Sequence, residues 1–323
     1  MKKILTVSIA GYHVQKYIRN TLNSLIAEEI IQELEIFVVD DGGSDKTLEI
    51  VKEYSEKYPD SILGIHKENG GYGSVINKSV ELATGKYFKQ LDGDDWFHTE
   101  NLSKLVALLR GLDVDAVYTP VNEIYEGTNK MILRDHFSEI KEGIYEFDKF
   151  SFQFANSMHE TTVRTKILKD MNLHVTEHCF YTDVEYVCLP LPYLKTFYVS
   201  HVPIYQYRLG VEGQSVSPEG VRKHYKEHEK VFWHTVKIYR NVSPERSSIR
   251  NLLMNRLKKE FAVQLKYYCM LDIDTLPEMK AFAEKVKETE PEIFQETMRY
   301  SRFAKTLLKS NYLLYPVLKK MVK

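Results

Sequence analysis

The sequence has few cysteines and no long apolar run, and both absences narrow the class of protein. Only Cys179, Cys188 and Cys269 are present, and none stands in a Cys-x-x-Cys pair. Such a set forms neither a disulfide framework nor a zinc site, so a reducing cytoplasm fits best. No stretch reaches the roughly 20 apolar residues that span a bilayer, and the apolar start at residues 5–10 is too short for a signal peptide. We therefore predict a cytoplasmic protein.

An excess of either charge is also lacking. The chain carries 44 Lys and Arg against 45 Asp and Glu. A protein that binds a polyanion usually has a basic surplus, so the composition predicts no nucleic-acid partner. With 323 residues, 43% of them hydrophobic, the chain is long enough for one large α/β domain and a smaller appendage.

Short apolar runs alternate with helical periods in the first third of the chain. Strands are expected at residues 5–10, 35–39, 61–65 and 86–91, with amphipathic helices between them. One helix is expected to be capped by Ser44, and another to run from His98 to Arg110. This order predicts an α/β fold with a Rossmann-like, mostly parallel sheet and helices on both faces. Ligands bind such a sheet beyond the carboxyl ends of its strands.

Three carboxylates lie within four residues directly after the fourth expected strand. Asp92, Asp94 and Asp95 surround Gly93, which lets a backbone approach closely. Like charges this close are costly unless a cation joins them, and a hard divalent ion bound by carboxylates and substrate phosphates is the usual solution. Alternatively, the triplet is a solvated acidic turn that caps the next helix.

A second acidic pair ends the second expected strand. Asp40 and Asp41 precede Gly42-Gly43-Ser44, and in a parallel sheet they face the same crevice as Asp92 and Asp94. One of the two carboxylates could accept hydrogen bonds from a base or a ribose. Asp40 could equally well cap the following helix.

Taken together and in order, these segments resemble the motifs of family-2 glycosyltransferases of the GT-A fold. The matching segments are residues 10–17 (AGYHVQKY), 38–45 (VVDDGGSD), 69–77 (NGGYGSVIN) and 91–96 (LDGDDW). The resemblance covers about the first 110 residues. It implies an inverting hexosyl- or N-acetylhexosaminyltransferase that uses Mn²⁺ or Mg²⁺ and a nucleotide diphosphate sugar, most often a UDP-sugar. The implied acceptor is a glycan, lipid-linked or protein-glycan molecule of the cell surface.

The resemblance also assigns roles to individual residues. Asp92 and Asp94 would hold the metal. Asp183, in the segment at residues 180–185 (FYTDVE), would be the catalytic base, with Glu185 second; alternatively, Asp183 only stabilises a helix start. The residues implied to contact the donor are Ala10, Tyr12, Asp41, Asn69, Gly71, Asn77, Asp92, Gly93 and Arg208.

Three positions depart from the family pattern. Ile76 stands where many relatives carry Arg, so the cationic contact to the donor is either missing or supplied by another residue such as Lys78 or Arg208. His13 replaces the usual Asn, and Ala10 replaces Pro. The polar pair His159-Glu160 could touch the acceptor or could be a buried structural pair. A catalytically silent scaffold that binds nucleotide sugars would often have lost Asp94 or Asp183, and both are present.

We expect the chain to divide into residues 1–217 and 218–323. The first part would be the GT-A domain, with a nucleotide-binding half at about 1–112 and an acceptor half at about 113–217. The second part is helical, and its last segment, residues 302–323, holds six basic and no acidic residues among many apolar ones. Such a segment suits a helix on an anionic membrane at the inner face of the cell. Equally, it could pack on the catalytic domain or on a second subunit of a homodimer.

Overall fold

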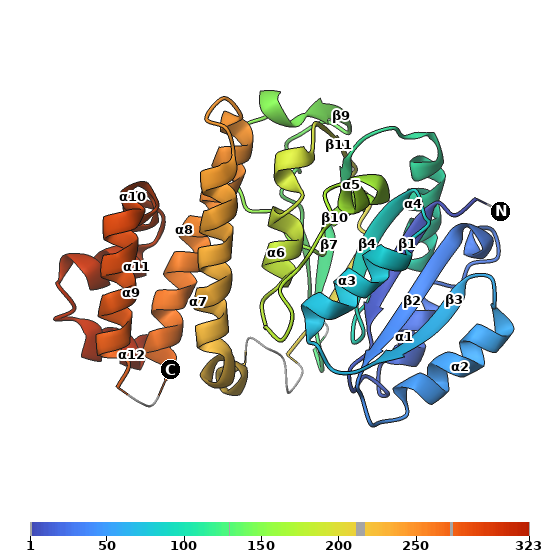
Figure 1. Ribbon diagram of the computed structural model, residues 1–323, viewed down its shortest axis with the longest axis horizontal. Helices are drawn as coiled ribbons and strands as arrows, with labels where there is room; N and C mark the ends of the chain where they lie inside the picture. The colour runs from blue at the N-terminus through green and yellow to red at the C-terminus, as the bar shows by residue number, and fades with distance from the viewer. Residues whose placement is uncertain (1, 129, 211–216, 272–273, 323) are drawn as a thin grey trace. The chain divides into compact units, whose positions relative to one another are not determined.

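The computed structural model describes residues 2–128, 130–210, 217–271 and 274–322, which form two compact units. Unit 1 comprises Met1–Phe150 and Asn156–Val211, and unit 2 comprises Ser151–Ala155 and Glu212–Lys323. Figure 1 shows the mixed α/β unit in blue to yellow and the helical unit in orange to red.

Strands and helices alternate along unit 1. The strands are β1 (Leu5–Ala10), β2 (Leu34–Asp41), β3 (Ile62–Lys67), β4 (Tyr87–Asp92), β5 (Trp96–Phe97), β6 (Ala116–Tyr118), β7 (Val121–Tyr125), β8 (Met131–Arg134), β9 (Gly143–Glu146), β10 (Thr161–Arg164), β11 (Thr196–Val199) and β12 (Tyr205–Leu209). The helices are α1 (Ile18–Asn23), α2 (Thr47–Lys57), α3 (Tyr72–Leu82), α4 (Thr99–Gly111), α5 (Thr165–Asp170) and α6 (Asp183–Cys188), with short 3-10 turns at Ile31–Glu33, Phe147–Lys149 and Leu191–Tyr193.

The central sheet has the order β3-β2-β1-β4-β10-β6-β11-β9. The first four strands run parallel, and β10 is antiparallel to both of its neighbours. In the parallel register, Ala10 at the end of β1 lies opposite both Val39 of β2 and Asp92 of β4. The carboxyl ends of these strands therefore meet at one edge of the sheet. A second, smaller sheet has the strand order β5-β12-β7-β8.

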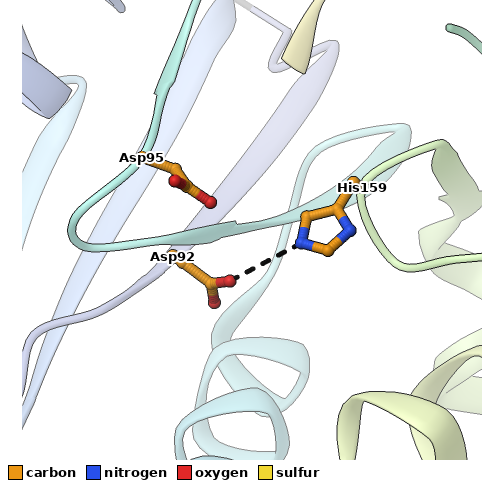
Figure 2. Close-up of side chains that lie close together, drawn as sticks. All are labelled: Asp92, Asp95 and His159. Atoms are coloured by element: carbon orange, nitrogen blue, oxygen red, sulfur yellow. Dashed lines mark ion pairs between the residues drawn. The ribbon is translucent and has the colours of Figure 1, made fainter. Parts of the chain in front are cut away.

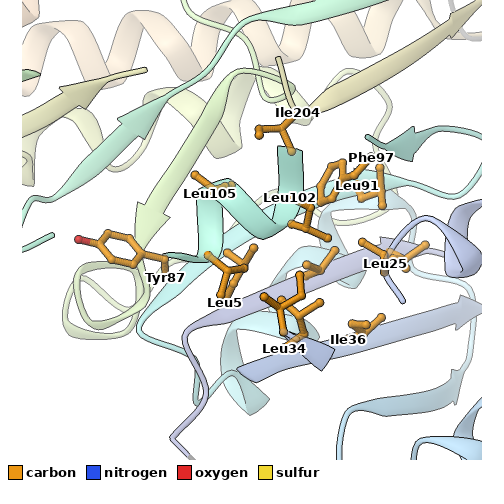
Figure 3. Close-up of a cluster of buried hydrophobic side chains, with 14 of the residues drawn as sticks. Leu5, Leu25, Leu34, Ile36, Tyr87, Leu91, Phe97, Leu102, Leu105 and Ile204 are labelled. Atoms are coloured by element: carbon orange, nitrogen blue, oxygen red, sulfur yellow. The ribbon is translucent and has the colours of Figure 1, made fainter. Parts of the chain in front are cut away.

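Each strand of the central sheet alternates its side chains between two helical layers. Leu5, Val7 and Ile9 of β1 belong to the hydrophobic core formed with α1, α2 and α4 (Figure 3). On the other face, the hydroxyl of Ser8 donates a hydrogen bond to that of Ser79 in α3. The prediction of an α/β, Rossmann-like, mostly parallel sheet with helices on both faces is confirmed.

Unit 2 is built from helices, and its described residues include no strand. Its helices are α7 (Pro218–Asn241), α8 (Ser247–Met270), α9 (Leu276–Thr289), α10 (Pro291–Tyr300), α11 (Arg302–Lys309) and α12 (Tyr315–Val322). Phe232 of α7, Phe261 of α8 and Phe282 of α9 form an aromatic core with ring centroids 5.4–5.9 Å apart. This core shows how the unit buries the apolar stripes of its helices.

The start of α2 differs from the sequence prediction. Ser44 does not cap that helix, which begins at Thr47. The carboxylate of Asp45 instead accepts hydrogen bonds from the backbone N–H groups of Thr47 and Gln15. Asp45 thus ties α2 to the loop after β1. The sequence correctly predicted that a helix begins in this turn, but the cap assigned to Ser44 was wrong.

Candidate active site

The acidic turn after β4 is held rigidly by its surroundings. The hydroxyl of Thr21 in α1 donates to the carbonyl oxygens of Gly93 and Asp95, at 3.0 and 2.7 Å. A Cβ at position 93 would lie 2.3 Å from the carbonyl oxygen of Ala10, so only glycine fits there. The turn is thus locked against the end of β1, and the three carboxylates have little freedom to separate.

Asp95 is the buried member of the triplet. Its carboxylate accepts the hydroxyl of Tyr205 at 2.8 Å and the backbone N–H of Arg208 at 2.7 Å. Burial, together with the charges of Asp92 and Asp94, raises the pKa of Asp95 well above its usual value. A carboxylate in this position is stabilised by any cation that joins the group.

Asp92 and Asp95 form a group with His159, as Figure 2 shows. One ligand atom from each of the three side chains lies within 4.8 Å of the others, and Nε2 of His159 is 3.8 Å from Oδ2 of Asp92. The ring of His159 stacks on Tyr207 with centroids 4.3 Å apart. Two carboxylates and an imidazole are a donor set that suits a divalent metal such as Mn²⁺.

The register of β10 explains how His159 reaches this place. Val163 lies opposite Phe88, so two residues before Thr161 the antiparallel count arrives at the level of Asp92. The buried ammonium of Lys89 in β4 also donates to the carbonyl oxygen of His159 at 2.8 Å. The sequence left two roles open for His159, a contact with the acceptor or a buried structural pair. It did not place His159 beside Asp92, because no local pattern indicates an antiparallel strand next to β4.

Asp94 stands next to a cation and at the edge of the group. Asp94 is not among the three residues whose ligand atoms lie close together. Burial and the charge of Asp92 raise the pKa of Asp94 to about 6. Nε of Arg208 donates to the carbonyl oxygen of Asp94 at 2.8 Å. The guanidinium of Arg208 lies over the rings of Trp96 and Tyr17, 4.6 and 4.9 Å from their centroids.

Arg208 is therefore a cation beside the acidic turn, and its Nη1 also pairs with the exposed carboxylate of Glu126 at 2.6 Å. Ile76, which replaces the family arginine, is fully buried. Lys78 pairs with Glu81 on the same exposed helix face. Of the two substitutes proposed from the sequence, the structure brings Arg208 to the backbone of the acidic turn.

Asp183 is the first residue of α6, and its charge acts on the same tyrosines as the acidic turn. The hydroxyl of Tyr72 donates to Oδ1 of Asp92 at 2.6 Å. Burial raises the pKa of Tyr72 and of Tyr207, and the charges of Asp92 and Asp183 raise both further. Asp183 is half-buried, which leaves part of its side chain accessible.

Glu185 occupies a different environment from Asp183. Its buried carboxylate accepts the backbone N–H and the hydroxyl of Thr176, at 2.8 and 3.0 Å. Asn77 also holds this loop: its side chain exchanges hydrogen bonds with the backbone of Val175 and donates to Glu177. Both side chains are thus engaged in fixing the segment that leads into α6.

Asp41 organises the loop between β3 and α3. Its buried carboxylate accepts hydrogen bonds from the backbone N–H groups of Gly70 and Gly71 and from the ammonium of Lys67, at 2.7–2.9 Å. The amide of Asn69 donates to the carbonyl oxygen of Asp41. Gly71 has a φ of 79°, which glycine adopts without strain. These predicted donor-contacting residues therefore form one connected loop.

Two further predicted residues lie at the end of β1. Ala10 is half-buried beside Asp92, and Tyr12 is exposed, with its ring 4.3 Å from that of His13. Asp40, for which a capping role was left open, accepts the N–H of Gly43 and pairs with His66 at 2.7 Å. Tyr12 thus exposes its ring at this edge, while Asp40 is hydrogen-bonded within the turn.

Fold and site together define the class: an α/β protein with a carboxylate-rich site at the carboxyl ends of parallel strands. The sequence model described as Glycosyl transferase family 2 matches residues 6–180, more than half of the chain. The chain belongs to glycosyltransferase family 2, and the resemblance drawn from its motifs is confirmed.

Relatives and solved structures agree with this assignment. The chain is 26% identical over 217 residues to the putative glycosyltransferase EpsH of Bacillus subtilis, covering 64% of this chain and 60% of that one. It is 26% identical over 208 residues to the minor teichoic acid biosynthesis protein GgaB of B. subtilis, covering 63% and 23%. The chain thus spans less than two thirds of the length of these relatives.

Two solved structures share the fold. S. aureus TarS 1-349 in complex with UDP-GlcNAc matches with a TM-score of 0.71 and 17% identity, over 98% of this chain and 90% of that one. The mannosyltransferase PcManGT from Pyrobaculum calidifontis, in complex with GDP-Man and Mn²⁺, matches with a TM-score of 0.58 and 15% identity, over 100% and 84%. At these identities the likeness concerns the GT-A fold.

Proposed function

We propose that the protein is an inverting, metal-dependent transferase that moves a hexosyl or N-acetylhexosaminyl group from a UDP-sugar to a growing cell-surface glycan. The observation that carries this proposal is the group of Asp92, Asp95 and His159 at the carboxyl end of β4. Two converging carboxylates and an imidazole at this sheet edge suit a cation held against a diphosphate. The wider acceptor class includes lipid-linked and protein-bound glycans.

The acidic turn would bind Mn²⁺ or Mg²⁺ through Asp92, with Asp94, Asp95 and His159 as the remaining candidates. The residues fit a metal because burial and mutual repulsion raise the pKa of Asp94 and Asp95, and both effects are relieved by a divalent charge. When bound, the metal supplies charge stabilisation to the departing diphosphate. Arg208 adds a fixed positive charge on the same side.

Donor recognition is assigned to the end of β1 and to the loop held by Asp41. Tyr12 is exposed at this edge and would stack on the nucleobase. Asp41, Asn69 and Gly71 would shape the base pocket as one unit, since their hydrogen bonds already connect them. Neighbours of the same fold carry UDP-GlcNAc and GDP-Man, which supports a nucleotide sugar as the donor.

Asp183 would act as the catalytic base. Its carboxylate would take the proton of the acceptor hydroxyl while that oxygen attacks the anomeric carbon and the nucleotide diphosphate leaves on the opposite face. Of the two acids in this segment, Asp183 is the accessible one, whereas Glu185 is buried and hydrogen-bonded to Thr176. This difference supports Asp183 over Glu185.

The relatives indicate which kind of product to test first. One is named for minor teichoic acid biosynthesis, and this supports a polymer of the cell surface as the acceptor. We place the enzyme in the cytoplasm, at the inner face of the cell membrane, where nucleotide sugars are consumed.

The proposal is tested by incubating the protein with a panel of UDP- and GDP-sugars and Mn²⁺ or Mg²⁺ and measuring nucleotide diphosphate release. We expect release from one UDP-sugar that disappears with EDTA and in Asp94→Ala. Asp183→Asn should bind the donor normally but stop transfer, whereas Asp170→Asn, an exposed acid on α5, should behave as wild type. Undiminished release in EDTA would defeat the metal assignment, and undiminished release in Asp94→Ala would remove Asp94 from the metal site. Undisturbed transfer in Asp183→Asn would defeat the base.

A further inference from the structure

The last described segment of unit 2 has two apolar faces instead of one. It consists of α11, a turn at residues 310–314, and α12. One face is packed inside the unit, with Ala304, Leu307, Tyr315 and Leu318 all buried. The hydroxyl of Tyr315 lies 3.5 Å from that of Thr275, which fixes α12 against the rest of the unit. Internal packing therefore accounts for only some of the apolar side chains here.

The other face is exposed. Leu313, Leu314, Val317 and Met321 have 82%, 42%, 56% and 75% of their surface accessible. Val317 and Met321 are four residues apart and lie along one side of α12, while Leu313 and Leu314 lie in the turn that leads into this helix. Large apolar side chains this exposed and this closely grouped mark a surface that meets an apolar partner. We call these four residues the tail surface.

The charges beside the tail surface have a single sign. From Arg302 to Lys323 the sequence has six basic residues and no acidic one. Within the part of the chain that the structure describes, Arg302, Lys305, Lys309 and Lys320 are exposed and form no ion pair. Basic side chains without counter-charges, next to exposed leucine, valine and methionine, complement a surface that is both apolar and anionic.

We infer that the tail surface docks on an anionic phospholipid bilayer. Leu313, Val317 and Met321 would lie among the acyl chains just below the headgroups, while Lys309 and Lys320 would contact lipid phosphates. The helix would lie in the plane of the membrane: no helix among the described residues is long and apolar enough to cross one. The inference does not depend on the reaction that the protein catalyses.

A second copy of the chain is the main competing occupant. A symmetric dimer through the tail surface would set two segments with six basic and no acidic residues against each other. Like charges repel at such an interface, and neither segment has an acidic residue that could pair with the basic ones. The charge pattern therefore favours the lipid.

The test is sedimentation of the full chain with vesicles of pure phosphatidylcholine and with vesicles that contain phosphatidylglycerol. We expect binding only to the anionic vesicles, weakened by salt. The triple substitution Leu313→Gln, Val317→Gln, Met321→Gln should lower binding at least tenfold. Lys309→Gln with Lys320→Gln should also lower it, by roughly fivefold for each charge.

Matched controls separate this surface from general stickiness. Met131→Gln with Leu133→Gln removes exposed apolar groups from β8, and Lys52→Gln with Lys104→Gln removes exposed charges from α2 and α4. Both pairs should bind vesicles as wild type does. Wild-type protein that ignores anionic vesicles, or a triple variant that binds them equally well, would overturn the inference. So would light scattering that shows a dimer which the triple substitution dissociates.

Discussion

At the scale of single residues, His159 is the least predictable part of the site and the most informative one to change. Its imidazole faces Asp92 and stacks on Tyr207, so it can serve as a metal ligand with little rearrangement. We expect His159→Gln to lower Mn²⁺ affinity by at least about tenfold, as measured by electron paramagnetic resonance of free Mn²⁺. Thermal unfolding should change little.

The control for His159 is another histidine paired with an aspartate. His66→Gln removes a largely exposed ring that pairs with Asp40. It should leave Mn²⁺ affinity unchanged. Equal Mn²⁺ affinity in His159→Gln and wild type would remove His159 from the site.

Gly93 gives a second test at this scale. Its added Cβ would meet the carbonyl oxygen of Ala10 at 2.3 Å and a methyl of Val14 at 2.9 Å. We expect Gly93→Ala to destabilise the protein by about 1–3 kcal/mol and to weaken donor binding, because β1 and the acidic turn must move apart. Denaturant unfolding and calorimetric donor titration measure the two effects.

Gly111→Ala is the matched control for Gly93→Ala. At Gly111, the last residue of α4, a Cβ would have no atom within 4 Å. Alanine there should leave both stability and donor binding close to wild type. If both alanine variants behave alike, the close approach at Gly93 does not constrain the site.

At the scale of elements, the first third of the sequence predicted most of the strands and helices because its apolar runs alternate with clear helical periods. The prediction placed Asp92 and the Asp41 loop at the same sheet edge, where the structure has them. It could not foresee β10, a four-residue strand from later in the chain that inserts beside β4. Short antiparallel strands are defined by tertiary pairing, so His159 was left without a partner.

The helices of unit 2 offer an element-scale prediction about pH. The carboxylate of Glu260 in α8 is buried between His228 of α7 and Arg256, at 2.7 and 3.0 Å. Burial alone would raise the pKa of Glu260, but the interactions with His228 and Arg256 hold it at about 2. A carboxyl whose pKa falls on folding stabilises the fold above its unfolded pKa of about 4.5 and loses that contribution as pH falls toward 2.

We therefore expect Glu260→Gln to destabilise the helical unit by about 3–5 kcal/mol at neutral pH, because His228 and Arg256 lose their buried partner. Between pH 4.5 and 2, the free energy of unfolding of the variant should also decrease less than that of wild type. Urea unfolding followed by circular dichroism at several pH values measures both effects. An unchanged pH profile would show that Glu260 does not carry the linkage.

At the scale of the whole molecule, the chain combines a GT-A unit that carries the acidic site with a helical unit that carries the tail surface. The overall composition indicates neither the acidic site nor the tail surface, since the charges cancel over the chain. Motif spacing supplied the family, while the structure supplied the partners of each carboxylate and the exposed face of α12.

The central claim is that the acidic turn holds a metal against the donor diphosphate. Calorimetric titration with UDP-GlcNAc, in Mn²⁺ and in EDTA, tests it most directly when wild type and Asp92→Asn are compared, since UDP-GlcNAc is the donor carried by a neighbour of the same fold. We predict that wild type binds at least about tenfold more tightly in Mn²⁺, and that Asp92→Asn in Mn²⁺ binds no better than wild type in EDTA. Binding that is equally tight in all four titrations would contradict the account.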